Sequence, residues 1–327
     1  MSDELKGKSC LVTGASGFIG TYMCQELRRQ GAKVTALLRK ESSGEWDACV
    51  FCKLGEHVIP SHIMKDVDIV FHLAGHAHSI SEDVAEDNLY FLTNVNGTRD
   101  LLQASKNEDV EKFVYFSSVK SIGEEATERL DEAADPKPLS SYGKSKLEAE
   151  NLVINGGYVA SPTVLRLPMV YGASEKGNLP RMVNAISKNW FPPFPKIKNK
   201  RSMIHVDDVV QGAILAATNQ VSARKTYILC DDIDYSTRQL YEIICMSIGK
   251  KVPSWGVPVF MFYLLAKVGD LLNVFRGAGM YFNSDNYQKL FGSSYFSCDK
   301  AKLELGFSPK RTLAKSISRT SSGVNLK

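Results

Sequence analysis

The sequence lacks the features that mark several classes of protein. Only seven of its 327 residues are cysteine, and they are odd in number and dispersed, which is typical of free thiols in a reducing compartment. We find no internal repeat and no low-complexity tract. The first eight residues have neither the basic start nor the long apolar run of a secretory signal, so we expect a cytoplasmic protein.

The sequence also lacks an excess of charge of one sign. The 40 Lys and Arg residues against 36 Asp and Glu residues leave a formal net charge of +4 and no dominant basic stripe, which argues against a nucleic-acid-binding protein. With 44% hydrophobic residues, the chain can bury a large core. Because a single core stops growing at about 250–300 residues, we expect a major and a minor lobe.

No apolar run is long enough to span a bilayer, which needs about 20 residues. One candidate, Val257 to Leu265, continues through Lys267 and Asp270 to Phe275. Its polar face is less basic than that of an interfacial membrane helix. We therefore expect this segment to form a buried helix of the minor lobe.

Short apolar runs alternate with helical patterns through the first half of the chain. Runs that are hydrophobic throughout indicate strands buried on both faces, and the intervening amphipathic helices indicate a parallel sheet covered on both sides. The predicted fold class is α/β, with a doubly wound parallel sheet of the Rossmann type and a smaller C-terminal lobe. The expected strands are Ser9 to Thr13, Lys33 to Leu38, Ala48 to Lys53, Ile69 to Ala74, Lys112 to Ser117, Thr163 to Arg166, Met203 to Val206 and Tyr227 to Leu229.

The first expected strand runs into a glycine-rich turn, Thr13-Gly-Ala-Ser-Gly-Phe-Ile-Gly20, which opens a helical pattern. Its three glycines permit a tight turn, let the backbone approach a pyrophosphate and allow the helix to pack closely on the strand. The amides of the helix N-terminus then face the anion. We predict a dinucleotide site formed by Gly14, Ser16, Gly17, Phe18, Ile19 and Gly20.

The end of the second expected strand indicates which dinucleotide is bound. NAD sites usually place Asp or Glu there for the ribose 2′-hydroxyl, whereas Arg accommodates a 2′-phosphate. Here Leu38 is followed by Arg39 and Lys40, so we predict NADP, with NAD as the alternative. A solvated basic turn would explain the same residues.

A tyrosine and a lysine stand four residues apart in Tyr142-Gly-Lys-Ser-Lys146, at the start of a helical pattern. On a helix this spacing places both side chains on one face, where an ammonium stabilises a phenolate and lowers the pKa of the tyrosine from about 10. Ser117 and Ser118 close a strand upstream, at the edge where doubly wound folds bind ligands. Tyr142 is thus a candidate proton donor, and a serine hydroxyl is a candidate partner for a substrate carbonyl oxygen.

In their order along the chain, these motifs resemble those of the extended short-chain dehydrogenase/reductases. The shared motifs are Thr13-Gly-x-x-Gly-x-x-Gly20, His72-Leu-Ala-Gly75, Asn94-Val-Asn-Gly-Thr98, Ser118 and Tyr142-x-x-x-Lys146. Three later motifs resemble the nucleotide-sugar epimerase and reductase branch: Leu165-Arg-Leu-Pro-Met-Val-Tyr-Gly172, Lys176-Gly-Asn178 and Arg201-Ser-Met-Ile-His-Val-Asp-Asp208.

The resemblance implies a role for each matching residue. Tyr142 would be the acid/base, Lys146 would orient the tyrosine and the nicotinamide ribose, and Ser118 would bind the reacting oxygen. Asn178 and Arg201 match positions that contact the diphosphate of a nucleotide-sugar substrate. The remaining cofactor-binding residues implied by the motifs are Leu73, Ala74, Gly75 and Asn94, together with Tyr142 and Lys146.

Departures from the family pattern narrow the activity. Val119 and Lys120 stand where 4,6-dehydratases carry an Asp-Glu pair, which disfavours dehydration. Leu38 and Met169 stand where UDP-galactose 4-epimerases carry an acidic residue and an asparagine, which weakens the case for retained NAD. The sequence is thus similar to 4-ketoreductases and epimerases of UDP- or dTDP-linked sugars.

We therefore expect an NADPH-dependent reductase that acts on the 4-keto group of a UDP- or dTDP-linked hexulose. The alternative is a 4-epimerase of a UDP-hexose or UDP-N-acetylhexosamine with retained NAD, which would use the same residues. A non-catalytic dinucleotide-binding module of the same fold is a third hypothesis. The intact set of Ser118, Tyr142 and Lys146 argues against it.

The resemblance also implies an assembly and a division into domains. The helical segments Thr98 to Asn107 and Lys144 to Val153 resemble those that pair across a two-fold axis into a four-helix bundle, so we expect a homodimer. We expect residues 1–167 with about 200–232 to form the NADP-binding domain, and residues 168–199 with 233–327 to form the nucleotide-sugar-binding lobe.

Metal binding has little support in the sequence. His72, His76 and His78 lie close together, but the nearby acidic residues lack the spacing of a metal site. Cys49 and Cys52 have no second close pair to complete a zinc site, and we expect them to be ordinary buried thiols. We predict no metal, and we keep His76 and His78 as candidates for substrate contact.

Overall fold

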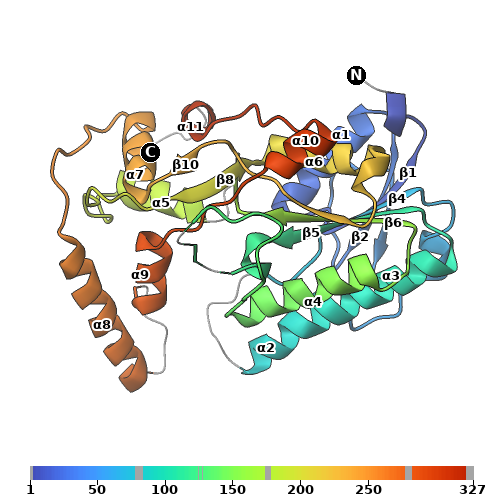
Figure 1. Cartoon of the computed structure of the whole chain (residues 1–327), viewed down its shortest axis with the longest axis horizontal. Coiled ribbons are helices and arrows are strands. Elements are labelled where there is room, and N and C mark those ends of the chain that lie inside the picture. The colour runs from blue at the N-terminus through green and yellow to red at the C-terminus, as the bar shows by residue number, and fades with distance from the viewer. Residues whose placement is uncertain are drawn as a thin grey trace.

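The computed structural model describes residues 3–77, 84–123, 125–126, 128–173, 178–276 and 282–321. Its main feature is a seven-stranded parallel sheet in the order β3-β2-β1-β4-β5-β6-β9, which the chain builds outward from β1 in both directions (Figure 1). The predicted doubly wound α/β fold is confirmed. The strands are β1 (Ser9–Thr13), β2 (Lys33–Leu38), β3 (Ala48–Phe51), β4 (Ile69–His72), β5 (Lys112–Ser118), β6 (Ser161–Leu167) and β9 (Lys225–Ile228).

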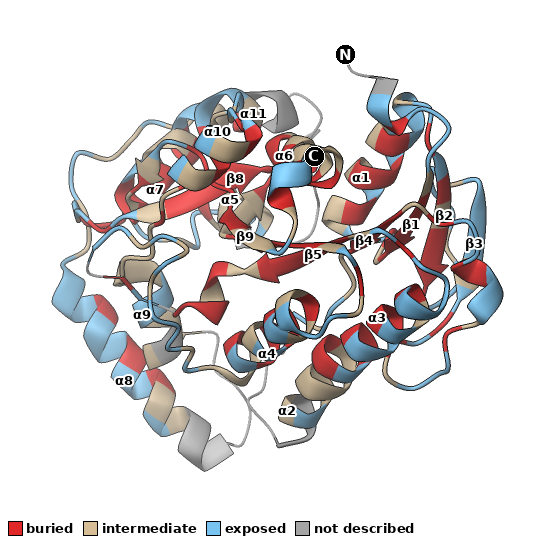
Figure 2. Ribbon diagram, turned by 45° about the vertical axis from the view of Figure 1, so that its right-hand side comes forward, coloured by how far each residue is buried: buried red, intermediate tan, exposed pale blue. Residues whose placement is uncertain are grey.

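Helices cover both faces of this sheet. The helices α1 (Phe18–Arg29), α6 (Val206–Thr218) and α10 (Asp299–Leu305) contribute buried side chains to the core on one face. The helices α3 (Gly97–Asn107) and α4 (Ser141–Asn155) do so on the other face. Figure 2 shows the buried strands lying between these two layers.

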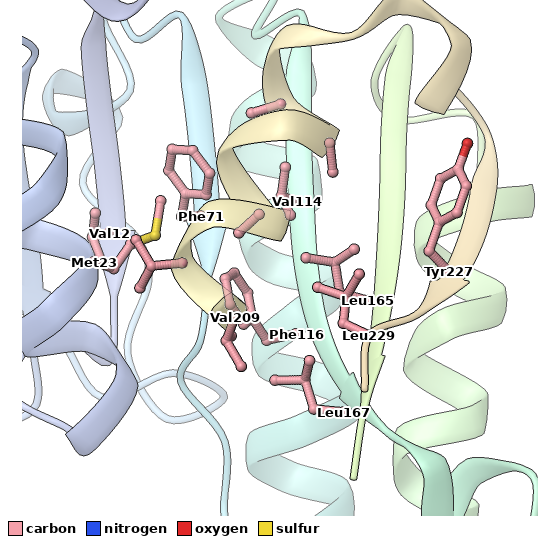
Figure 3. Packing of buried hydrophobic residues seen from close by; sticks show 14 of the residues in the cluster. Val12, Met23, Phe71, Val114, Phe116, Leu165, Leu167, Val209, Tyr227 and Leu229 are labelled. Atoms are coloured by element: carbon pink, nitrogen blue, oxygen red, sulfur yellow. The ribbon is translucent and has the colours of Figure 1, made fainter. Parts of the chain in front are cut away.

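The core explains why the strands read as nearly continuous apolar runs. Val12, Phe71 and Val114, from three adjacent strands, pack with Met23 of α1 on one side of the sheet (Figure 3). Their chain neighbours, such as Leu11, belong to the cluster on the opposite side. Each strand is therefore buried on both faces, as parallel sheets require.

Short elements connect these layers. α2 (Val84–Tyr90) continues through the π-helical segment Phe91–Asn96 directly into α3, and α3 lies beside α4 (Figure 1). The short 3₁₀ segments are Asp3–Leu5, Ser61–Ile63, Val119–Ser121 and Gln220–Ser222.

A smaller lobe is built around a second sheet, whose strand order is β10-β8-β7. The expected strand near Met203 lies in this sheet as part of β8, whereas the expected strand near Tyr227 joins the large sheet as part of β9. A separate cluster of buried residues, including Phe194 and Leu240, supports the proposed two-lobe organisation. The elements of the lobe are β7 (Met169–Tyr171), α5 (Asn178–Ser187), β8 (Arg201–His205), β10 (Asp234–Tyr235), α7 (Thr237–Ser247), α8 (Val259–Arg276), α9 (Ser284–Phe291) and α11 (Leu313–Ser321).

The apolar segment that starts at Val257 forms the expected helix, α8, but the prediction that it is buried is wrong. Among the residues of α8 whose burial the structure describes, 259–272, the buried ones are Phe262, Ala266 and Gly269, on one narrow side. Leu264 is 56% exposed and represents a larger set of exposed apolar residues on this helix. Apolar composition predicted the helix, but it could not show that Phe194, Phe282 and Phe291 of the lobe contact α8 on one side, at Phe262.

Two further expectations concern thiols and membranes. Cys52 is buried as expected, but Cys49 is exposed, because β3 is the edge strand of the large sheet and has few covering side chains. In the part of the chain that the structure describes, no helix has the length and apolar character needed to cross a bilayer.

Candidate active site

The glycine-rich turn joins β1 to α1 in the predicted way. Gly14 has a positive φ of 68°, a backbone angle that residues other than glycine rarely adopt. A Cβ on Gly20 would lie 2.1 Å from the carbonyl oxygen of Gly14, so the first turn of α1 approaches the end of β1 as only glycine allows. Gly17 precedes α1 and has no side chain that could cap the helix. The amides of the first turn are therefore left for an anion.

The end of β4 lies against this turn. A Cβ on Gly14 would lie 2.8 Å from the Ala74 nitrogen, so the backbones of the two loops touch. Ala74 also donates its amide to the Thr13 hydroxyl over 3.0 Å. The predicted cofactor residues Leu73, Ala74 and Gly75 thus lie next to the glycine-rich turn, at the carboxyl edge of the large sheet.

His72 connects β1 to α3 at this edge through two hydrogen bonds. The Thr98 hydroxyl donates to the carbonyl of Asn94, so the Nε2 hydrogen of His72 donates to the Thr98 oxygen over 2.8 Å. Its Nδ1 then accepts the Thr13 hydroxyl over 2.7 Å. Burial lowers the pKa of His72 to about 3, which keeps the ring neutral. Within the described residues, no group of three or more His, Cys, Asp or Glu side chains could hold a metal ion.

Asn94 connects the loop after β4 to α4. Its amide oxygen accepts the His76 amide over 2.8 Å, and its amide nitrogen donates to the His76 carbonyl and to the Ser145 hydroxyl. A Cβ on Gly75 would lie 3.0 Å from the Asn94 oxygen and 3.8 Å from Lys146 Nζ. The loop that borders the glycine-rich turn is therefore also adjacent to the predicted catalytic lysine.

Tyr142 lies in the first turn of α4, after the cap Ser140, whose hydroxyl accepts the Gly143 amide over 3.1 Å. Ser118, at the carboxyl end of β5, lies close enough to the Tyr142 hydroxyl to lower the pKa of the tyrosine. Its ring lies 5.8 Å from the ring of Tyr90. The structure thus brings together the two oxygens that the sequence placed 24 residues apart.

The predicted direction of the Tyr142 pKa is wrong in this structure. Burial raises the pKa of Tyr142 to about 12, and the hydrogen bond from Ser118 opposes that increase. Lys146 is not among the groups that shift the pKa of Tyr142, and burial lowers the pKa of the lysine itself to about 7, while the nearby Glu150 carboxylate raises it. Helical spacing gave the positions of the two side chains but contained no information about their burial.

Lys146 is held in place from one side. Its Nζ donates to the carbonyl oxygen of Phe116 over 2.7 Å and lies 4.2 Å from the centroid of the Tyr115 ring. Both partners belong to β5, so the strand that ends in Ser118 also positions the lysine. Two of the three ammonium hydrogens remain for other acceptors.

Glu150, one helical turn after Lys146, forms a buried ion pair that sequence reasoning missed. Arg166 on β6 donates Nη2 to Glu150 Oε2 over 2.7 Å, and both side chains are at most 7% exposed. The hydroxyls of Ser117 and Ser121 donate to Oε1. The signal in the sequence was a carboxylate four residues after the lysine together with an arginine between two leucines of a buried strand.

This ion pair distinguishes the two adjacent serines. Ser117 is buried and donates to Glu150, whereas Ser118 is partly exposed and lies near the Tyr142 hydroxyl. Alternation along β5 sends their side chains to opposite faces of the sheet. The geometry therefore supports Ser118 as the partner of Tyr142.

The remaining residues predicted to contact cofactor or substrate lie on several different elements. Arg39 and Lys40 are exposed beyond the end of β2. Asn178 is the first residue of α5, and the structure describes nothing of its side chain. His78, like Lys176 and Gly177, lies outside the described residues.

Arg201 begins β8 and is largely enclosed. Its Nη2 donates to the Gly292 carbonyl over 3.1 Å, and burial lowers its pKa. Next to Gly292 is an open cavity of about 470 Å³. Two lysines that the sequence reasoning did not single out contribute to it; its lining residues are Glu125, Ala126, Lys198, Lys200, Gly292, Ser293 and Tyr295.

Comparisons with known proteins agree with this geometry. A UDP-glucose 4-epimerase of Vibrio cholerae is 26% identical, and the alignment covers 97% of this chain and 96% of that protein. The N-acetyl-alpha-D-glucosaminyl-diphospho-ditrans,octacis-undecaprenol 4-epimerase of Escherichia coli O157:H7 is also 26% identical, with 95% and 93% covered.

A solved structure shares the fold. The UDP-glucuronic acid 4-epimerase of Bacillus cereus, solved in complex with NAD, superposes with a TM-score of 0.74 at 20% identity, covering 96% of this chain and 97% of that one. The family model described as the NAD dependent epimerase/dehydratase family matches residues 10–230, from β1 through β9. Because this match covers most of the chain and confirms the family predicted from the motifs, the protein belongs to the NAD dependent epimerase/dehydratase family.

Proposed function

We propose that the protein is a 4-epimerase of a sugar carried on a diphosphate, with NAD as its retained cofactor. The observation that carries the proposal is the convergence of three elements at one sheet edge: Ser118 at the end of β5 near the Tyr142 hydroxyl of α4, with Lys146 adjacent to the loop that borders the glycine-rich turn. The two curated relatives are named as 4-epimerases, of UDP-glucose and of a polyprenol-linked sugar. Both names describe a sugar joined to a diphosphate, which is the substrate class that we propose.

The residues at the sheet edge fit a dinucleotide. The turn at Gly14 and Gly20 leaves the amides at the start of α1 free for a pyrophosphate, and Gly75 leaves space beside Lys146 for a ribose. NAD, when bound there, supplies the acceptor of the hydride removed from C4 of the sugar and then the source of its return.

The proton transfer belongs to the chain. Tyr142 Oη in its anionic form would accept the proton of the sugar 4-hydroxyl while Ser118 holds the sugar oxygen by a hydrogen bond. Tyr142 would return the proton after the sugar has presented its other face. Because burial raises the pKa of Tyr142 to about 12, the anionic form would need a cation nearby, and we assign that role to protonated Lys146, one helical turn further along the same face of α4.

A 4-ketoreductase that uses NADPH is the second candidate. One observation favours it: β2 ends at Leu38 without a carboxylate, and the exposed Arg39 and Lys40 follow. Proton donation by Tyr142 and oxygen binding by Ser118 would be the same. The reactions named for the relatives favour the epimerase, since both act at C4 without a net change in oxidation state.

Identification of the cofactor that accompanies the purified protein separates the two candidates. The protein is denatured and the released nucleotides are resolved by chromatography. An epimerase is expected to release close to one NAD per chain, because it reoxidises the cofactor within each turnover. An empty site that binds NADPH at least tenfold more tightly than NADH would favour the reductase instead. Arg39→Ala should then remove that preference, because only NADPH carries a 2′-phosphate.

A further inference from the structure

The helix α8 presents an apolar face that nothing in the described structure covers. It packs on the lobe through Phe262, Ala266 and Gly269, and a Cβ on Gly269 would lie 1.9 Å from the carbonyl oxygen of Phe282. This close approach uses the smallest residues of the helix. Figure 1 shows α8 at the edge of the molecule beside α9, and Figure 2 shows most of its length exposed.

The exposed side is a continuous apolar stripe. Phe260, Leu264, Val268 and Leu271 recur at spacings of four, four and three residues, so they share one face of the helix. They are between 53% and 62% exposed. Met261 and Leu265 widen this face on one side. We call these six residues the α8 face.

No acidic side chain interrupts the α8 face. Asp270 is the only acidic residue of α8, and its carboxylate accepts the amide and the hydroxyl of Ser284, which turns it toward the start of α9. Lys267, at the edge of the face, is exposed, lies 5.6 Å from the centroid of the Tyr263 ring and forms an ion pair with Asp270 over 3.8 Å. The border of the apolar face on this side therefore carries an aromatic ring and a cation that Asp270 partly balances.

The chain segments next to the start of α8 contain basic residues but no acidic ones. Residues 178–206 contain six Lys and Arg, residues 243–269 contain three, and neither segment contains Asp or Glu. The two segments are joined, since the Val257 amide donates to the Pro193 carbonyl over 2.9 Å and Lys250 Nζ donates to two carbonyls at the end of α5.

Two tryptophans add to this border. Trp190 is 76% exposed and carries the Lys188 ammonium 5.0 Å above its ring, and Trp255 is 61% exposed. Tryptophan and lysine at the edge of an apolar face are typical of segments that lie at the boundary between headgroups and acyl chains. Interfaces between proteins, by contrast, are depleted in lysine.

We propose that the α8 face docks on an anionic lipid surface. The six apolar side chains would enter the boundary of the acyl region, and exposed cations of the two joined segments, such as Lys188 and Lys251, would face the lipid headgroups. The sequence had indicated too little basic charge for this role. That judgement counted the polar face of the helix alone, whereas the cations lie on segments that the fold brings next to it.

Flotation of the full-length protein with vesicles tests this proposal. One set of vesicles contains phosphatidylcholine alone, and the other contains phosphatidylcholine and phosphatidylglycerol at 7:3. We expect flotation with the anionic vesicles and at least about tenfold weaker partitioning onto the neutral ones. Equal partitioning onto both vesicles, or none onto either, would overturn the proposal.

Matched variants locate the contact. Replacing Phe260, Leu264 and Leu271 by Asp should reduce partitioning at least tenfold, because three exposed apolar side chains become charged. The control replaces Val58 and Leu303, which are 92% and 87% exposed elsewhere, by Asp and should bind vesicles as the parent does. Circular dichroism and the melting temperature of both variants verify folding. If the α8 variant instead floats unchanged, the α8 face is not the docking surface.

Light scattering tests whether a second copy of the chain, instead of lipid, covers the α8 face. A second copy of the chain on the α8 face would make the triple variant lose an oligomer that the control retains, with no binding of vesicles by the parent. That result would replace the lipid by a protein partner and overturn the proposal. The test measures partitioning and mass, so its failure leaves the proposed epimerase activity unaffected.

Discussion

At the scale of single residues, burial determines the chemistry of the site more than spacing does. The sequence located Tyr142, Lys146 and Ser118 correctly as neighbours, because helix and strand periodicity fix relative positions. It could not give the sign of the pKa shifts, since burial raises the pKa of Tyr142 to about 12 and lowers that of Lys146 to about 7. Burial depends on contacts between elements far apart in the chain.

The first prediction concerns the proton donor. Tyr142→Phe removes one hydroxyl and keeps the ring, so NAD binding should change little while kcat falls by about 10²–10⁴-fold. The measurement is steady-state turnover together with the retained cofactor per chain. Tyr158→Phe, on the same side of the sheet but outside the site, is the control and should keep its turnover. A Tyr142→Phe enzyme with near-parent kcat would remove the proposed proton donor.

The second prediction concerns the buried ion pair. Glu150→Gln leaves the charge of Arg166 buried without its partner, and loss of one member of such a pair destabilises by about 3–5 kcal/mol. Denaturant unfolding measures the effect. Adding Arg166→Met to Glu150→Gln should recover part of the loss, because the uncompensated charge is removed. A double variant less stable than the single one would contradict this explanation.

The third prediction concerns Asp231, which follows β9 and accepts the Tyr171 hydroxyl over 2.8 Å. Burial raises the pKa of Asp231 to about 7 from an ordinary 3.8. The native state therefore holds this proton more tightly than the unfolded chain does. The resulting stabilisation is complete below about pH 4 and is lost as the pH rises through 7.

Asp231→Asn should accordingly stabilise the protein at pH 8, by about 4 kcal/mol at most, and have little effect near pH 4. Its exposed neighbour provides the control, since Asp232→Asn should shift stability by less than about 1 kcal/mol at either pH. Melting temperatures at both pH values check the sign. Equal effects of the two substitutions at pH 8 would contradict the assigned burial.

At the scale of secondary-structure elements, the sequence predicted best where geometry permits one residue type. The turn between β1 and α1 was predicted because its glycines have no substitute at close backbone contacts. The position of the strand near Met203 was not predicted, since an apolar run does not state which sheet it joins. The prediction that α8 is buried was wrong for the same reason, because the sequence pattern of a helix defines an apolar face but not what packs against it.

The fourth prediction belongs to the element that holds the pyrophosphate. Gly20→Ala would place a Cβ 2.1 Å from the Gly14 carbonyl oxygen, so α1 must move away from the end of β1. We expect retained NAD to fall below one tenth of its parent value. Gly157→Ala, at an open position with positive φ, is the control for a general loss of stability. Full retention of NAD by Gly20→Ala would contradict the assigned geometry.

At the scale of the whole molecule, the described chain forms two sheets, and β8, which we expected in the cofactor domain, lies in the smaller one. β5 and β6 of the large sheet supply Ser118 and Arg166, and the small lobe supplies Arg201 and the cavity lysines. The sequence identified residues of both lobes from motifs. It missed Lys198 and Lys200 because cationic residues in a loop read equally well as a solvated surface.

The fifth prediction is a homodimer through α3 and α4, which lie side by side on one face of the large sheet (Figure 1). Light scattering at micromolar concentration should give twice the mass of the chain. Charge reversal at the exposed Arg99 and Lys144, on these two helices, should shift the mass toward one chain. The α8 variant should remain a dimer. A single-chain mass for the parent would refute this assembly.

The most direct test of the central claim is interconversion of 4-epimers by the purified protein without any added cofactor or reductant. UDP-glucose, UDP-N-acetylglucosamine and N-acetylglucosaminyl-diphospho-polyprenol are supplied separately, and products are identified by nuclear magnetic resonance. The account predicts that at least one of them reaches the same mixture of 4-epimers from either direction. No interconversion of any of the three, with NADPH consumed only when a 4-keto sugar is supplied, would contradict it.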